Sequence, residues 1–149
     1  MSIRSLRGAG RVLLFALAVG VTLGAAPAGR YQVDAETVLD RATGLTWQRT
    51  SAPGTYTWEQ ARLYCEGLAL GTPDAGWRLP TVRELSTLVD AKASRPTIDT
   101  AAFPGTPATR FWTSTTYVPA AASAWSVVFS DGGVLHAGLG EAHSVRCVR

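Results

Sequence analysis

Two segments of the chain carry apolar residues at the three- or four-residue spacing of an amphipathic helix. The first begins at residues 57–60 (TWEQ), where a threonine followed three positions later by a glutamine forms a capping box, which satisfies two backbone amides at a helix start. Because Cys65 belongs to the apolar face, the pattern predicts a helix that turns this cysteine toward the core. The residues of that face are Trp58, Ala61, Tyr64, Cys65 and Leu68.

The second helical segment follows residues 76–80 (GWRLP). Residues 81–84 (TVRE) form another capping box, and Pro80 forces Leu79 into an extended conformation that cannot continue a helix backwards. The stretch is therefore predicted to be a helix entry, with Trp77 and Leu79 as core anchors. The apolar stripe of this second helix consists of Val82, Leu85, Leu88 and Val89.

Short runs of β-forming residues surround the two helices. Residues 37–40 and 45–48 flank a four-residue turn that ends at Gly44, which favours a β-hairpin because glycine adopts positive φ at no steric cost. In the run 124–130, Trp125, Val127 and Phe129 alternate with Ser126, Val128 and Ser130, as in a sheet packed mainly on one side. Four further strands are predicted over residues 111–117, 124–130, 134–139 and 144–148.

The first 28 residues have the composition of a secretory leader. Three arginines precede an apolar run over residues 12–23, and residues 26–28 (APA) supply the small side chains that a signal peptidase reads. About twelve apolar residues are too few for a membrane-spanning helix, which needs roughly 20. We expect cleavage after Ala28, a periplasmic or secreted protein, and no membrane span after cleavage.

Removing this leader changes the charge balance. Three of the 14 basic residues lie in it, so the remaining 121 residues carry 11 basic and 11 acidic residues and a formal net charge of zero. Nucleic-acid binding, which depends on a basic face, therefore loses its compositional support. The remaining length suits one compact domain over residues 29–149.

Both cysteines of the chain, Cys65 and Cys147, lie in the part expected to be exported. An oxidising compartment and an even count favour one disulfide over two buried free thiols. Val145 and Cys147 share a face of the last predicted strand, so Cys147 can meet Cys65 of the first helix in the core. Such a bond closes a loop of about 80 residues and is worth roughly 4 kcal/mol in the chain-entropy model.

Residues 91–110 show no periodicity and contain three prolines. Connections this long are often functional loops, although an irregular, packed connection is the alternative. Just beyond the loop, aromatic side chains on a strand are candidates for stacking on sugar rings, whereas burial in the core is the alternative for Trp112. The candidate ligand-binding residues are Asp99, Arg110, Trp112 and Tyr117.

Sequence features of enzymes and metal sites are lacking. No nucleophile elbow of the form Gly-x-Ser-x-Gly occurs, and neither His136 nor His143 makes a short ligand spacing with a cysteine pair. Residues 131–133 (DGG) offer one carboxylate, whereas calcium takes six or more oxygens. We expect a protein that is not an enzyme, with no catalytic residue, no cofactor and no metal.

Six motifs, taken in order, resemble the signatures of the Lcl C-terminal domain family, which is named for a bacterial collagen-like adhesin. The resemblance covers the chain from about residue 38 to residue 149. Arg-Leu-Pro-Thr before a helix and a terminal Arg-Cys-Val are also similar to motifs of formylglycine-generating enzymes and of the wider C-type lectin-like fold. The motifs are residues 43–48 (TGLTWQ), 64–65 (YC), 76–81 (GWRLPT), 98–100 (IDT), 111–115 (FWTST) and 145–149 (VRCVR).

The resemblance implies an α+β, C-type lectin-like domain with two helices packed on short, mainly antiparallel strands and a long irregular loop. In that fold a cysteine of the first helix pairs with one of the last strand, as Cys65 and Cys147 would here. It also implies an adhesin-like binding module with sulfated polysaccharide as its ligand class. The chain has no Gly-X-Y repeat and hence no collagen stalk, and its zero net charge weakens the case for a strongly anionic ligand.

The expected partner is a glycan or, as an alternative, another protein of a cell-envelope assembly. An enzyme of unrecognised type is the least favoured alternative.

Overall fold

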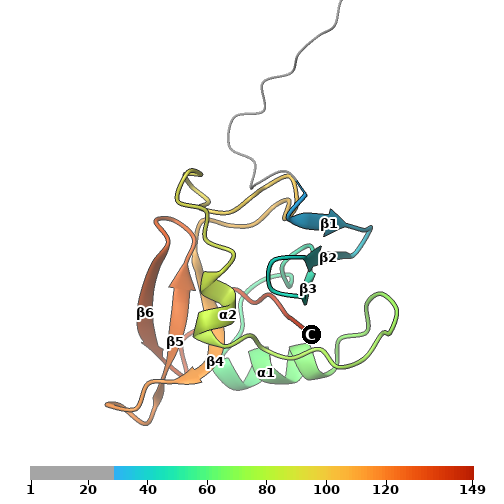
Figure 1. Cartoon of the computed structure of the whole chain (residues 1–149). Coiled ribbons are helices and arrows are strands. Elements are labelled where there is room, and N and C mark those ends of the chain that lie inside the picture. The colour runs from blue at the N-terminus through green and yellow to red at the C-terminus, as the bar shows by residue number, and fades with distance from the viewer. Residues whose placement is uncertain (1–28) are drawn as a thin grey trace, which may run out of the picture.

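The computed structural model describes residues 29–149 and shows two three-stranded antiparallel sheets and two short helices, an α+β fold (Figure 1). The predicted leader, residues 1–28, lies outside the described residues. Within residues 29–149, neither helix has the length and apolar character needed to cross a membrane.

The first sheet contains β1 (Tyr31–Val33), β2 (Thr37–Asp40) and β3 (Leu45–Gln48) in that order. It confirms the predicted hairpin, in whose turn Gly44 has a φ of 74°. The sequence pattern missed β1, because three residues are too few to show an alternation.

The second sheet contains β4 (Arg110–Thr116), β5 (Ser123–Val128) and β6 (Gly133–Gly138), and confirms three of the predicted strands with ends shifted by one or two residues. Helix α2 contacts β4 and β5, whereas α1 contacts β4. Ser126 and Val127 are both fully buried, so the centre of this sheet is covered on both faces. The expectation of packing mainly on one side was wrong, because Ser126 is buried with its hydroxyl donating to the Leu135 carbonyl.

Both predicted capping boxes are confirmed, at α1 (Trp58–Glu66) and α2 (Val82–Ser86). At α2, the Thr81 hydroxyl accepts from the Glu84 amide at 3.2 Å and the Glu84 carboxylate accepts from the Thr81 amide at 2.8 Å. Arg78 pairs with the same carboxylate at 2.6 Å and holds the pKa of Glu84 at about 2. The helix contains only five residues, although Leu88 beyond its end is buried as the stripe predicted.

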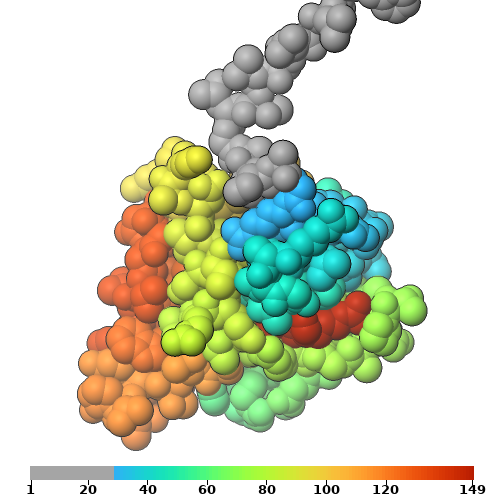
Figure 2. Space-filling model, in the orientation of Figure 1, coloured from blue at the N-terminus to red at the C-terminus, as the bar shows by residue number. Residues whose placement is uncertain are grey.

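Residues 143–149, called here the closing segment, run between the two sheets. A regular strand was predicted over residues 144–148, but the backbone makes single bridges to four partners instead, because each partner comes from a different part of the chain. Figure 2 shows the end of the segment, in red, emerging between the cyan first sheet and the green chain that follows α1. The bridged partners are Trp47, Tyr56, Arg78 and Phe111.

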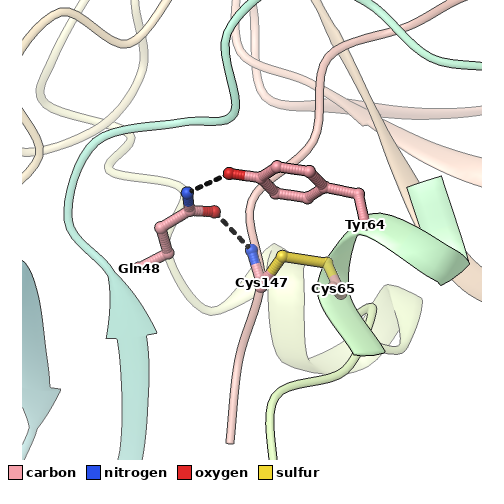
Figure 3. The surroundings of a disulfide bond; sticks show 4 residues. All are labelled: Gln48, Tyr64, Cys65 and Cys147. Atoms are coloured by element: carbon pink, nitrogen blue, oxygen red, sulfur yellow. Dashed lines mark hydrogen bonds between the residues drawn. A yellow bond between two sulfur atoms is a disulfide. The ribbon is translucent and has the colours of Figure 1, made fainter. Parts of the chain in front are cut away.

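A disulfide joins this segment to α1. Cys65 and Cys147, separated by 82 positions, are bonded as predicted, with both side chains fully buried. Figure 3 shows Gln48 beside the bond: its amide nitrogen donates to the Tyr64 hydroxyl at 2.9 Å, and its oxygen accepts from the Cys147 amide at 3.2 Å. Gln48 of β3 is therefore hydrogen-bonded to both α1 and the closing segment.

The core forms two clusters, and the closing segment contributes to both. Val148 packs in the first cluster with Trp47 and Phe111. Val145 and Cys147 pack in the second cluster, which contains the predicted anchors Trp77 and Leu79. One irregular segment therefore contributes side chains to both core clusters.

The connection from α2 to β4 has no helix or strand, as expected, and is packed over much of its length. Ile98 and Phe103 are buried in the first core cluster, and the Thr97 amide donates to the Phe129 carbonyl at 2.8 Å. Near its end, Gly105 and Thr109 are exposed and line a surface cleft, whereas Thr106 between them is buried.

Reducing the disulfide should destabilise the protein by up to about 4 kcal/mol, because the unfolded chain regains the entropy lost in closing a long loop. Urea unfolding of the oxidised protein and of a Cys65→Ser/Cys147→Ser variant measures the difference. Equal unfolding midpoints and slopes for the two would contradict this assignment.

Thr81→Ala should lower the free energy of unfolding by about 1 kcal/mol, because the Glu84 amide loses its acceptor at the start of α2. Thermal unfolding measures the loss. Thr81→Ser, which keeps the hydroxyl, is the matched control and should stay close to the unaltered protein. A Thr81→Ala protein as stable as the serine variant would show that the cap contributes nothing.

Candidate functional site

A cleft of about 520 Å³ opens where four segments meet: residues 51–55 before α1, residues 105–109 at the end of the long connection, the first residue of β4, and residues 142–144. Hydrogen bonds hold these walls together. The Ser144 amide donates to the Arg110 carbonyl at 3.0 Å, and the hydroxyls of Thr109 and Ser144 lie 3.0 Å apart. The polar side chains lining the cleft belong to Ser51, Thr55, Thr109, Arg110, His143 and Ser144.

His143 lies in the wall of the cleft, against an aromatic ring of the core. Its ring lies 4.7 Å from the Trp112 ring, and its side chain is only 16% exposed. Burial lowers the pKa of His143, the positive charge of Arg110 lowers it further, and Glu141 opposes both effects. The Nε2 atom lies 3.4 Å from the Glu141 carboxylate and makes no hydrogen bond among the described residues.

Glu141 is itself held in place by the backbone. One of its carboxylate oxygens accepts from the Gly138 amide at 2.8 Å, and this hydrogen bond lowers the pKa of Glu141. The exposed carboxylate is therefore ionised at neutral pH and lies beside His143 and Arg110.

A second cation, Arg146, lies behind the wall of the cleft. Its guanidinium is fully buried, 4.8 Å from the centre of the Phe103 ring, and donates to the Thr106 hydroxyl at 2.8 Å. Thr106 is flanked by Gly105 and Pro107, which both line the cleft. Burial lowers the pKa of Arg146 to about 9, so the group still carries its charge at neutral pH.

The structure distributes the four predicted site residues over different environments. Arg110 lines the cleft. Trp112 is fully buried beneath His143, with its indole nitrogen donating to the Tyr56 carbonyl at 2.8 Å, so its ring belongs to the core. Asp99 is also buried, and its carboxylate accepts from the amides of the turn that follows it.

Tyr117 does not line the cleft. It stacks on His136 with the ring centres 4.1 Å apart, and its edge meets Trp125. The sequence shows no metal-ligand spacing between either histidine and the cysteine pair, and no sequence signal pointed to His143 or to residues 51–55 as part of a site. These residues gather where the closing segment pairs with the start of β4, through a parallel bridge between Ser144 and Phe111.

A second hollow of about 440 Å³ lies against the first sheet. Its charged lining residues are Asp34, Glu36 and Arg149. Two carboxylates against one guanidinium suit an acidic ligand less well than the first cleft does.

Arg146→Ala should lower the free energy of unfolding by about 3 kcal/mol or more, since it empties a buried volume and removes a donor from Thr106. Arg146→Met fills most of the volume and also removes a desolvated charge, so it should cost clearly less. Urea unfolding of both variants measures the two losses. Equal losses would contradict the assignment of Arg146 as a buried cation whose Nε and Nη1 atoms make no hydrogen bond among the described residues.

The sequence matches one known protein family. A family model described as the Lcl C-terminal domain matches residues 36–149, which include every described helix and strand except β1. No curated protein matches the sequence.

Proposed function

The chain belongs to the Lcl C-terminal domain family, and from that premise we propose that it is an exported, non-enzymatic binding module that recognises an acidic glycan, in the manner of an adhesin. The observation that carries the proposal is the cleft in which Arg110, His143 and several hydroxyls converge from four segments. Its volume of about 520 Å³ suits one or two sugar units, since ligand sites commonly measure 300–1,000 Å³.

The side chains of the cleft suit sulfated or carboxylated sugars. A guanidinium donates two parallel hydrogen bonds to a sulfate or carboxylate, and Arg110 is partly exposed at the cleft. Hydroxyls such as Ser51 and Thr55 exchange hydrogen bonds with sugar hydroxyls at little desolvation cost. Arg146 adds positive charge behind the wall, so a net charge of zero over the exported residues does not prevent a local attraction for anions.

The hydrogen bonding of the cleft favours binding over catalysis. A serine nucleophile needs a base that accepts its proton, but the Ser144 hydroxyl is paired with Thr109. The charged neighbour of His143 Nε2 is Glu141. With Ser144 paired to Thr109 and His143 next to Glu141, the described residues of the cleft form no hydrogen-bonded chain from a nucleophile through a base to an orienting group.

The disulfide between Cys65 and Cys147 supports both export of the protein and its assignment to a fold group. A structural disulfide persists in an oxidising compartment, which fits the expected periplasmic or secreted location. We assign the domain to the C-type lectin-like fold group because a cysteine of the first helix joins the last segment of the chain, as in that fold.

A protein-interaction role in a cell-envelope assembly is the second candidate, and the second sheet favours it. Strand β6 forms the edge of that sheet, and Val134 and Leu135 on it are 42% and 48% exposed. Val118, at the adjacent hairpin tip, is 89% exposed. An open edge with uncharged, exposed apolar residues is a surface to which another chain can add a strand.

Binding to immobilised sulfated and neutral glycans tests the first proposal. The purified protein should bind the sulfated set, and Arg110→Gln should weaken that binding about tenfold or more, because it removes a charge-assisted hydrogen bond of roughly 1.5–3 kcal/mol. Arg83→Gln, on the exposed side of α2, is the matched control and should have no effect.

Binding should also weaken as salt is raised, because the attraction is electrostatic. Equal losses in the two arginine variants would place the glycan outside the cleft. Failure of every glycan to bind, together with capture of a protein partner that Val134→Lys abolishes, would favour the interaction role instead.

A further inference from the structure

The hollow against the first sheet is lined by three charged side chains that do not pair with one another. Its volume is about 440 Å³, and its charged residues are Asp34 and Glu36, in the turn between β1 and β2, and Arg149, at the end of the closing segment. None of these three side chains makes a hydrogen bond or an ion pair with another described residue. Each therefore keeps its hydrogen-bonding capacity for a ligand.

The guanidinium of Arg149 is held in place without the use of its hydrogen-bond donors. The Arg149 amide donates to the Thr46 carbonyl, and the Thr46 amide donates to the Arg149 carbonyl, both at 2.9 Å. The guanidinium lies over the Trp77 ring, 4.9 Å from its centre. Stacking on an indole fixes the planar group and leaves its N–H groups free. This cation is therefore positioned before any ligand arrives, which lowers the entropy cost of binding.

Gly71 forms the wall of the hollow beside this guanidinium. A Cβ atom at Gly71 would lie 3.1 Å from Cγ2 of Thr37 and 3.2 Å from Nη2 of Arg149, and the φ of Gly71 is 70°. All three residues line the hollow. Glycine thus lets the backbone approach the guanidinium without a side chain that would cover Nη2. The buried nitrogen of Arg149 is Nη1, so Nη2 is the donor that can reach a ligand.

A smaller hollow of about 220 Å³ adjoins the first one, since Ala35 and Glu36 line both. It adds the hydroxyls of Thr50 and Ser51 and the apolar side chain of Leu70. Sites for organic ligands combine apolar surface with a few polar groups in this way. Together, the two hollows are called here the sheet groove.

We propose that the sheet groove is a second binding site, which takes uncharged sugars. A sugar hydroxyl both donates and accepts, so hydroxyls of one ligand can donate to the carboxylates of Asp34 and Glu36 and accept from Nη2 of Arg149. Two carboxylates against one guanidinium disfavour sulfated and carboxylated sugars. The inference goes beyond the proposed function and does not depend on it, because that function concerns acidic sugars in the cleft at Arg110.

NMR titration of the ¹⁵N-labelled protein with neutral tetrasaccharides of glucose, mannose and galactose tests the proposal. At least one of the three should shift the amide signals of Glu36, Thr37, Gly71 and Arg149 in a saturable manner. The amide signals of Thr109 and Ser144, which lie in the cleft, should stay in place. The titration yields the dissociation constant as well as the location of the site.

Glu36→Gln should weaken this binding about tenfold, because the hydrogen bond to a sugar hydroxyl loses the charge of its acceptor. Glu36 is exposed, so the substitution should leave the thermal unfolding midpoint unchanged. The matched control is Glu59→Gln, which alters an exposed carboxylate in the first turn of α1 and should bind as the unaltered protein does.

The outcomes decide between the two sites. Absence of shifts with all three tetrasaccharides, shifts confined to the cleft, or equal affinities of Glu36→Gln and Glu59→Gln would overturn the assignment of the sheet groove. Each of these results leaves the acidic-glycan proposal standing, because that proposal is tested with sulfated glycans and Arg110→Gln. Failure of sulfated glycans to bind would in turn leave the sheet groove unaffected.

Discussion

The structure depends on the covalent attachment of its closing segment to the first helix. Each sheet has only three strands. The closing segment completes the core by placing Val148 in one cluster and Val145 in the other. The bond between Cys65 and Cys147 holds it there, and Gln48 ties the same point to β3 through hydrogen bonds.

The cleft is formed by the same packing of the closing segment. Where the segment pairs with the first residues of β4, His143 and Ser144 line the cleft beside Arg110. Arg146, two residues after Ser144, is fully buried behind the same wall. The packing that stabilises the fold therefore also brings the polar groups of the site together. A change in the position of the segment would alter the core and the cleft at once.

Local signals in the sequence predicted much of the fold. The two capping boxes and the hairpin at Gly44 involve residues only a few positions apart, so their chemistry can be read directly from the chain. The disulfide was predictable because two independent patterns turned Cys65 and Cys147 inward. The closing segment was predicted as a regular strand, but partners drawn from four regions leave it with single bridges.

The site was much less predictable, because long-range packing creates it. Trp112 was a candidate for the surface, yet β4 lies between α1 and α2, so neighbouring residues of that strand are both buried. Asp99 has the side chain of a ligand-binding residue but supports a turn. Of the four predicted site residues, Arg110 lines the cleft. His143, which lines it too, belongs to the closing segment and is far from Arg110 in the sequence.

Amide hydrogen exchange in the oxidised and reduced protein tests the central claim most directly, namely that the disulfide-bonded closing segment organises both core and cleft. The amides of Ala52, Tyr56, Arg78 and Trp112 all donate to carbonyls of residues 143–149. On reduction, these four should lose protection together, while amides between β5 and β6 lose less. If reduction leaves the four amides as protected as before, the segment holds its place without the disulfide, and the account is contradicted.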